Sequence, residues 1–200
     1  FINTKEVWAQ RLSYVGELGF ELYIKINESK EIFNLILDKG KQFNLSLCGM
    51  FALDTMRMES GFLHWGHDIS PEENQYQAGL QFAISHKKNI DFVGKKSLLK
   101  LKDKKPSKKF AMLILNENKP GEPLLLHDEP IYLKDKIIGR TTSGNYSFNY
   151  KKNIAFGYIN SNYLKEDLIN KELYIEVEKK KYAATLLIKP LNDQLENNRK

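Results

Sequence analysis

The chain has 200 residues, of which 42% are hydrophobic and 28% are charged. Together with ten tyrosines and eleven phenylalanines, these proportions are typical of a folded globular protein and exclude a disordered one. The length allows one or two domains with a sizeable core. No apolar run approaches the roughly 18 residues that a membrane-spanning helix needs.

The net charge of +6 comes almost entirely from lysine, because only four of the 31 basic residues are arginines. Arginine is the residue that usually makes bidentate contacts with phosphate and guanine. The charge therefore does not favour a nucleic acid as the partner. Abundant lysine, asparagine and isoleucine together are more typical of a codon bias than of a binding surface.

Cys48 is the only cysteine, so the chain has neither a disulfide framework nor the ligand spacing of a zinc site. It ends the apolar segment Leu45–Cys48, and we expect it to be buried and inert. A reducing, cytoplasmic location fits this cysteine usage. The chain begins at Phe1 without a methionine or a signal peptide, which predicts a fragment or a processed piece of a longer protein.

The first predicted elements are two strands, over residues 6–13 and 20–26, on either side of a turn that contains Gly16 and Gly19. The polar side chains around this turn are Tyr14, Glu17 and Glu21. A carboxylate on a glycine turn can accept hydrogen bonds from the N–H edge of a heterocycle, because the backbone there allows close approach. The alternative is a plain hairpin whose acidic side chains are solvated.

A helix is expected to start at Glu28 or Ser29 and to stop at Gly40. Two strands followed by a helix make the beginning of the chain α+β. A second helix is expected over residues 49–59. The residues expected to face the core from this helix are Met50, Leu53 and Met56.

Arg57 on the second helix can pair with Asp54, three residues earlier. One interpretation is an exposed ion pair that contributes about 0.3 kcal/mol. The other is that the planar guanidinium holds an anionic or carbonyl group of a ligand. The spacing alone leaves both interpretations open.

The next segment, residues 61–74, contains His64, His67 and Asp68. Imidazole and carboxylate are common metal ligands, but no third histidine or cysteine lies nearby in the sequence. We therefore predict no metal site. Trp65, next to a glycine, is expected either to pack in the structure or to stack on a ligand.

A strand is expected over residues 78–84 and a short helix over residues 94–101. Residues 102–109 are charged, contain a proline and have no apolar side chain, which is typical of a linker. We therefore place a domain boundary near residue 105.

Beyond residue 109 the pattern changes to short strands that are separated by turn signals. The candidate strands are residues 110–115, 130–133, 136–142, 154–159, 173–177 and 181–188. This spacing, without a long helix, predicts a small antiparallel barrel or a Greek-key sandwich. Residues 191–200 form a polar tail that we expect to fray.

Several segments, in order along the chain, resemble the sequence signature of the aminomethyltransferase (glycine cleavage T-protein) family. They are Arg11–Tyr23, Gly49–Gly61, Gly66–Pro71, Ala78–Leu80, Asp91–Lys95, Ile138–Ser147 and Asn153–Tyr158. Within the family, Gly61–Gly66 and Thr142–Ser147 are most similar to the C-terminal folate-binding domain of dimethylglycine and sarcosine dehydrogenases.

The resemblance implies an α+β fold in two parts and a tail. Residues 1–105 would be the C-terminal half of a tetrahydrofolate-binding α+β domain. Residues 106–190 would be a small antiparallel β-barrel, and residues 191–200 the polar tail. The implied function is to capture a one-carbon unit from an N-methyl amine, of the dimethylglycine or sarcosine type, as methylenetetrahydrofolate.

Two alternatives stay open within this resemblance. One is a T-protein, which takes an aminomethyl group from a lipoyl carrier protein and releases ammonia. The other is a non-catalytic folate-binding module. The implied cofactor is tetrahydrofolate, with FAD only if a dehydrogenase domain lies upstream. The implied partners are the missing N-terminal half of the same protein and, for a T-protein, the lipoyl carrier; a nucleic acid or a membrane is not expected.

In the family, the residue that matches Glu17 holds the pterin, and the resemblance implies a folate site at Glu17, Arg57 and Tyr14. T-proteins often carry a second arginine four positions before the one that matches Arg57, where this chain has Leu53. If that earlier arginine is the folate contact, Arg57 is structural. The family's catalytic aspartate lies upstream of the signature, so we predict no catalytic residue in this chain and no folate-dependent activity of residues 1–200 alone.

Overall fold

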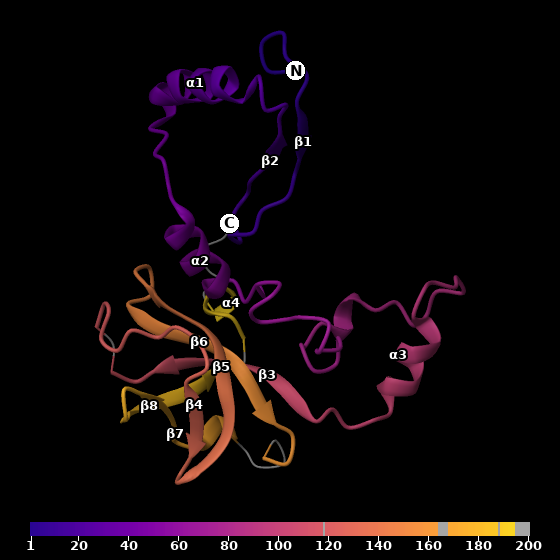
Figure 1. Ribbon diagram of the computed structural model, residues 1–200, viewed down its shortest axis with the longest axis vertical. Helices are drawn as coiled ribbons and strands as arrows, with labels where there is room; N and C mark the ends of the chain where they lie inside the picture. The colour runs from indigo at the N-terminus through magenta and orange to yellow at the C-terminus, as the bar shows by residue number, and fades with distance from the viewer. Residues whose placement is uncertain (118, 164–167, 188, 195–200) are drawn as a thin grey trace. The chain divides into compact units, whose positions relative to one another are not determined.

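A computed structural model describes residues 1–117, 119–163, 168–187 and 189–194 (Figure 1). The chain divides into two compact units, Phe1–Arg57 and Met58–Lys200, and each is described by itself. No helix in the described part of the chain is both long enough and apolar enough to cross a membrane.

The first unit contains a two-stranded antiparallel ribbon of β1 (Trp8–Gln10) and β2 (Glu21–Tyr23). The two predicted strands are right in position but too long, because only three residues of each pair across the ribbon. The outer residues of each predicted strand belong to the turn and to the flanking loops.

Two helices follow the ribbon. α1 (Ser29–Gly40) has the predicted bounds, and the short 3₁₀ turn η1 (Lys41–Phe43) comes directly after it. α2 (Met50–Glu59) begins in the first unit and ends in the second. Residues 45–48 form no strand, and Cys48 is exposed. The predicted burial of this cysteine is therefore wrong, because a segment without regular structure does not turn its apolar residues to one face.

The buried face of α2 is not the one that we predicted. Met50 is 74% exposed, whereas Thr55, Arg57 and Met58 are buried. The prediction assumed that an apolar stripe turns inward and a charged residue outward. A charged side chain can be buried when a partner compensates it, and Arg57 has such a partner in Asp54.

The second unit begins with a segment of turns that also contains η2 (Gln81–Ala83) and α3 (Lys95–Lys102). The strand expected over residues 78–84 is not formed, because the backbone at Gly79 has φ +75°, which interrupts an extended strand. α3 confirms the short helix expected in this region. The domain boundary near residue 105 falls between α3 and the first strand of the barrel, and stays a prediction.

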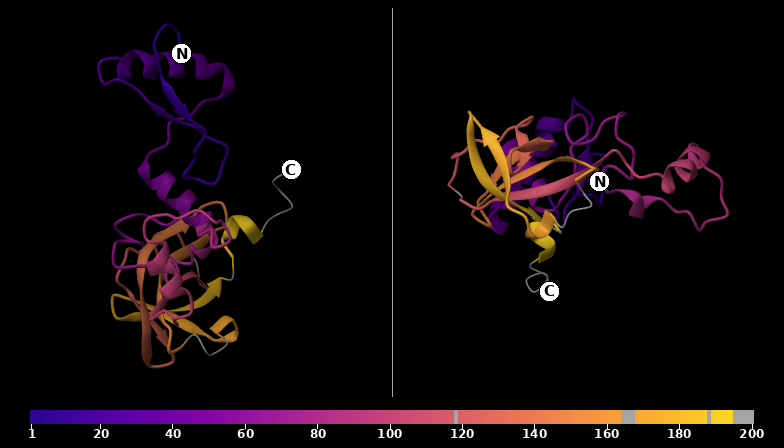
Figure 2. Two further views of the ribbon diagram at one scale, coloured as in Figure 1. Left: turned by 90° about the vertical axis from the view of Figure 1, so that its right-hand side faces the viewer. Right: turned by 90° about the horizontal axis from the view of Figure 1, so that it is seen from below.

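Six antiparallel strands close into a barrel in the order β3-β6-β5-β4-β7-β8, which Figure 2 shows from two further directions. They are β3 (Lys108–Leu115), β4 (Pro130–Leu133), β5 (Lys136–Ser147), β6 (Lys152–Asn160), β7 (Leu173–Val177) and β8 (Lys180–Leu187). η3 (Leu168–Asn170) precedes β7, and α4 (Leu191–Gln194) follows β8. The predicted α+β fold with a small antiparallel barrel is confirmed, while the tail beyond residue 194 lies outside the described residues.

β6 is buried on both faces over residues 153–159. On one face its side chains belong to the cluster that fills the barrel. On the other face Ile154 and Phe156 form a second cluster with Met58 and Leu191. The outer face of β6 is therefore covered by the end of α2 and by α4, and this packing positions the loop that follows α2.

Candidate functional site

The turn that joins β1 to β2 is tight. Gly16 has φ +74°, in the left-handed region that favours glycine. The N–H of Val15 donates a hydrogen bond to the hydroxyl of Ser13 at 3.3 Å. A Cβ on Gly19 would lie 3.2 Å from the Cβ of Ser13, so a larger residue would crowd the turn. The predicted glycine turn is therefore present.

The two acidic side chains around this turn differ in their surroundings. Glu21 accepts a hydrogen bond from the hydroxyl of Tyr23 at 2.9 Å, and this bond together with the charge of Glu21 raises the pKa of Tyr23. Glu17 is exposed on the turn itself, and Tyr14 beside it is half-buried. Glu21 thus belongs to the ribbon, and Glu17 is the carboxylate that faces solvent.

Arg57 lies on α2 and is 1% exposed. Its Nε donates to Oδ1 of Asp54 at 2.7 Å. The predicted ion pair is therefore confirmed, but its arginine is buried, contrary to the interpretation of an exposed pair. A buried guanidinium is held in place by its partner, because losing the partner would leave a desolvated charge.

Asp68 attaches the loop after α2 to the barrel through a buried carboxylate. Its Oδ1 accepts hydrogen bonds from the hydroxyls of Thr142 and Ser143, at 2.5 and 2.8 Å, where the pairing of β5 with β6 is irregular. Its Oδ2 accepts from the N–H of His64 at 2.9 Å. The hydroxyl of Tyr158 donates to the backbone carbonyl of Asp68 at 2.8 Å, and burial together with nearby carboxylates raises the pKa of Tyr158.

Two further carboxylates attach the same segment to the barrel. Glu59 accepts from the hydroxyl of Ser147 at 2.5 Å and from the amide of Asn149 at 2.9 Å. Glu73 accepts from the ammonium of Lys108 at 2.6 Å. Although burial raises the pKa of Glu73, the hydrogen bonds that it accepts hold this pKa below its ordinary value. The sequence interpretation missed all three anchors, because their partners lie 35 to 90 residues away along the chain.

The loop that Asp68 anchors carries exposed rings. The imidazoles of His64 and His67 stack with their centroids 4.4 Å apart. Trp65 is 66% exposed, so the interpretation that it packs in the structure is wrong. Across the described ranges, no group of three or more histidine, cysteine, aspartate or glutamate side chains is arranged to hold a metal ion.

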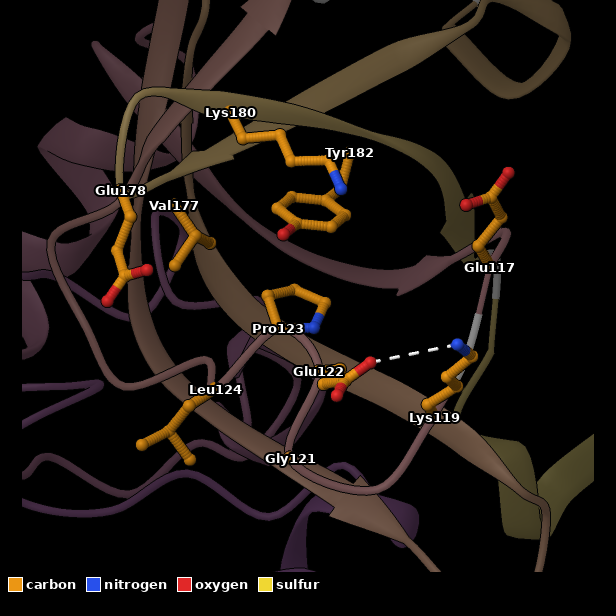
Figure 3. Close-up of a pocket in the computed structure, with 10 residues that line it drawn as sticks. All are labelled: Glu117, Lys119, Gly121, Glu122, Pro123, Leu124, Val177, Glu178, Lys180 and Tyr182. Atoms are coloured by element: carbon orange, nitrogen blue, oxygen red, sulfur yellow. Dashed lines mark ion pairs between the residues drawn. The ribbon is translucent and has the colours of Figure 1, made fainter.

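A surface cavity of about 710 Å³ lies on the barrel, between the loop that precedes β4 and the β7–β8 hairpin (Figure 3). The ring of Tyr182 and Pro123 point toward one another in it, and the ammonium of Lys180 lies 4.9 Å from the centre of that ring. Lys119 and Glu122 form an ion pair of 3.7 Å at its rim. None of the residues predicted to bind folate lines this cavity.

The sequence models of two domains match the chain. The GCVT N-terminal domain matches residues 1–88, and the glycine cleavage T-protein C-terminal barrel domain matches residues 108–193. The crystal structure of the glycine cleavage system aminomethyltransferase T from Bartonella henselae has the same fold, with a TM-score of 0.79 and 24% identity. That similarity covers 92% of this chain and 49% of the other.

Sequence identity with two relatives points to the same family. The chain is 34% identical to the mitochondrial dimethylglycine dehydrogenase of Rattus norvegicus, over 96% of this chain and 22% of that protein. It is 33% identical to the aminomethyltransferase of Listeria welshimeri serovar 6b, over 90% of this chain and 47% of that protein. The chain therefore spans between about a fifth and a half of the length of these relatives. The matches confirm the resemblance found in the sequence: the chain belongs to the aminomethyltransferase (glycine cleavage T-protein) family.

Proposed function

We propose that the chain is the C-terminal portion of a tetrahydrofolate-dependent protein that captures a one-carbon unit from an N-methyl amine as methylenetetrahydrofolate. The observation that carries the proposal is the exposed carboxylate of Glu17 on a tight glycine turn, within the segment that resembles the family signature. The identity with dimethylglycine dehydrogenase over nearly the whole chain supports an amine of the dimethylglycine or sarcosine type.

The residues present suit a folate. The carboxylate of Glu17 can accept hydrogen bonds from the N–H edge of a pterin, and Tyr14 lies beside it on the same turn. The guanidinium of Arg57 is 1% exposed and pairs with Asp54, so of its two predicted roles we assign Arg57 the structural one and not a contact with the ligand. Tetrahydrofolate supplies the nitrogen atoms that accept the one-carbon unit, and FAD belongs to the reaction only if a dehydrogenase domain accompanies this chain.

The binding test uses the full-length gene product. Titration calorimetry with 5-formyltetrahydrofolate compares the wild type with Glu17→Ala and with the matched control Glu6→Ala, another exposed glutamate of the first unit. Loss of an acceptor that leaves a bound donor unpaired costs about 1–3 kcal/mol, so we expect Glu17→Ala to raise the Kd about 5- to 150-fold. An unchanged Kd would remove Glu17 from the site.

The second candidate function is that of a T-protein, and the identity with the Listeria welshimeri aminomethyltransferase favours it. The two functions differ in the donor of the one-carbon unit. Methylenetetrahydrofolate formed from dimethylglycine and an electron acceptor would support the first, and ammonia released from an aminomethylated lipoyl carrier would support the second. Folate binding without either reaction would identify a non-catalytic folate-binding module.

Residues 1–200 alone are predicted to give no turnover, because the resemblance places the catalytic aspartate outside them. The measurement is methylenetetrahydrofolate formation by the purified 200-residue chain, with the full-length gene product as the positive control. Measurable formation by the chain alone would contradict this prediction.

The cytoplasmic location predicted from the cysteine usage also stays a prediction, which cell fractionation tests.

A further inference from the structure

The cavity that Tyr182 lines lies at one end of the closed barrel. β7 ends and β8 begins at this cavity, since Val177 and Lys180 both line it. Residues of the other wall, such as Glu117 and Leu124, follow the end of β3. Val177 and Tyr182 also pack against the hydrophobic cluster that fills the barrel. The cavity is therefore the mouth of the barrel at this end, and barrel mouths are among the places where proteins bind small molecules.

The loop wall of the cavity is held to the barrel by hydrogen bonds. The N–H of Asn116 donates to the carbonyl of Ala183 on β8 at 2.9 Å. The side-chain amide of Asn153, on β6, donates to the carbonyls of Lys119 and Glu122 at 3.4 and 3.5 Å. A cavity whose walls are held in this way is prepared for a ligand, because binding then orders few groups.

Four apolar side chains shape the cavity: Pro123, Leu124, Val177 and Tyr182. Pro123 is buried and Tyr182 is half-buried, whereas Leu124 is 62% exposed. In the view of Figure 3, the ring of Tyr182 lies between Lys180 and Pro123. An aromatic ring stacks well on another flat ring, and Leu124 leaves apolar surface for a ligand to cover. These walls favour a ligand with a flat apolar body.

The charged side chains that line the cavity are three glutamates and two lysines. Lys119 pairs with Glu122 at 3.7 Å. Among the described residues, neither Glu117 nor Glu178 has an ion-pair partner. Three carboxylates against two ammonium groups leave the lining with a formal charge of −1, whereas that of the whole chain is +6. A negative cavity on a positive chain favours a cation as the ligand.

The positions of the lysines distinguish the two glutamates that have no such partner. In Figure 3, Lys119 and the ammonium end of Lys180 lie on the side of Glu117, and Glu178 lies on the other side. Repulsion from these ammonium groups disfavours a cation near Glu117. Glu178 is therefore the carboxylate with which a bound cation can pair.

We propose that the mouth of the barrel binds a small organic cation with a flat apolar body, of the class of aromatic amidines and amines. The body of the ligand stacks on the ring of Tyr182 and contacts Leu124, and its cationic group pairs with Glu178. A folate is an anion and does not suit this cavity, so the inference goes beyond the proposed function.

Saturation-transfer NMR on the full-length gene product, without folate, tests the proposal independently of folate binding. The probes are benzamidine, which is a flat aromatic cation, and two analogues of nearly the same shape, the neutral benzamide and the anionic benzoate. Because the negative lining attracts only the cation, we expect the Kd of benzamidine to lie at least tenfold below that of benzamide. Benzoate should show no binding.

Three variants and a matched control assign the binding to the mouth of the barrel. Glu178→Gln keeps the shape of the side chain and removes its charge, and it should raise the Kd of benzamidine at least tenfold. Tyr182→Leu removes the aromatic ring and should raise this Kd at least fivefold, while Tyr182→Phe keeps the ring and should change it less than twofold. Glu172→Gln changes an exposed glutamate next to the opposite end of β7 and should leave the Kd unchanged.

Three results would overturn the proposal. Equal affinity for benzamidine and benzoate would show that the charge of the lining does not select a cation. The same benzamidine Kd in the wild type and in Glu178→Gln would place the binding elsewhere. Absence of benzamidine binding at millimolar concentration would show that the mouth takes no ligand of this class. Circular dichroism checks the fold of Tyr182→Leu, and Glu178→Gln, at an exposed turn residue, decides the matter if that variant unfolds.

Discussion

Replacing Asp68 by alanine tests whether one buried carboxylate holds the loop after α2 on the barrel. Within the described residues, the substitution removes the carboxylate that accepts from the hydroxyls of Thr142 and Ser143 and from the N–H of His64. A hydrogen bond to a charged group contributes about 1.5–3 kcal/mol, and hydroxyls can turn to another acceptor. We therefore expect the free energy of unfolding of the second unit to fall by about 3–5 kcal/mol, less than the sum of three such bonds.

Urea unfolding followed by circular dichroism measures this loss. With a slope of about 2 kcal/mol per molar urea, the midpoint should fall by about 1.5–2.5 M. The matched control is Asp135→Ala, which removes an exposed carboxylate paired with Lys181 at 3.7 Å and should change the stability by less than about 1 kcal/mol. If Asp68→Ala unfolds no more easily than this control, the carboxylate does not anchor the loop and the reasoning is refuted.

Three further substitutions test neighbouring contacts. Because the pKa of Glu73 lies below its ordinary value of 4.5, Glu73 contributes stability above pH 4.5, and this contribution is lost as the pH falls through the lowered pKa. Glu73→Gln should therefore reduce the drop in the urea midpoint that the wild type shows at acidic pH. Tyr158→Phe removes the donor to the Asp68 carbonyl and should cost about 1 kcal/mol in the same assay. Since the pKa of Tyr158 is raised above 10.0, wild-type stability should also fall above pH 10, and Tyr158→Phe should weaken that fall. Asp54→Asn replaces the carboxylate that accepts from Nε of the buried Arg57 by a neutral amide and should destabilise α2 by about 1–3 kcal/mol, which amide exchange in α2 measures.

The barrel could be predicted because much of its information is local. In β3 the buried residues alternate, with Ala111, Leu113 and Leu115 inside, and turn signals separate this strand from the next. Local patterns do not say which strands pair. The sequence therefore could not distinguish a barrel from a sandwich. The pairing of β3 with β8, which closes the barrel, is visible only in the structure.

In the candidate site, too, local features could be predicted from the sequence and long-range contacts could not. The glycine turn could be predicted, because the positive φ of Gly16 is a property of that residue type. The anchoring role of Asp68 could not, because its hydroxyl partners lie 74 and 75 residues later in the chain. The buried face of α2 was also missed, since a pattern of apolar residues carries no information on a buried arginine whose charge is compensated by a neighbour.

The apolar pattern of α1 now has a different meaning from the one that periodicity alone suggests. Residues 32–37 of this helix are mostly apolar, but Ile32 is the single buried residue of α1, and Phe33 is 48% exposed. In the barrel, the same kind of pattern is matched by burial on facing strands. An apolar stripe specifies that a helix has a buried side, and it does not specify which polypeptide covers that side. The stripe of α1 therefore predicts the helix but not how completely its apolar side is covered, since Leu35, Ile36 and Leu37 are only half-buried.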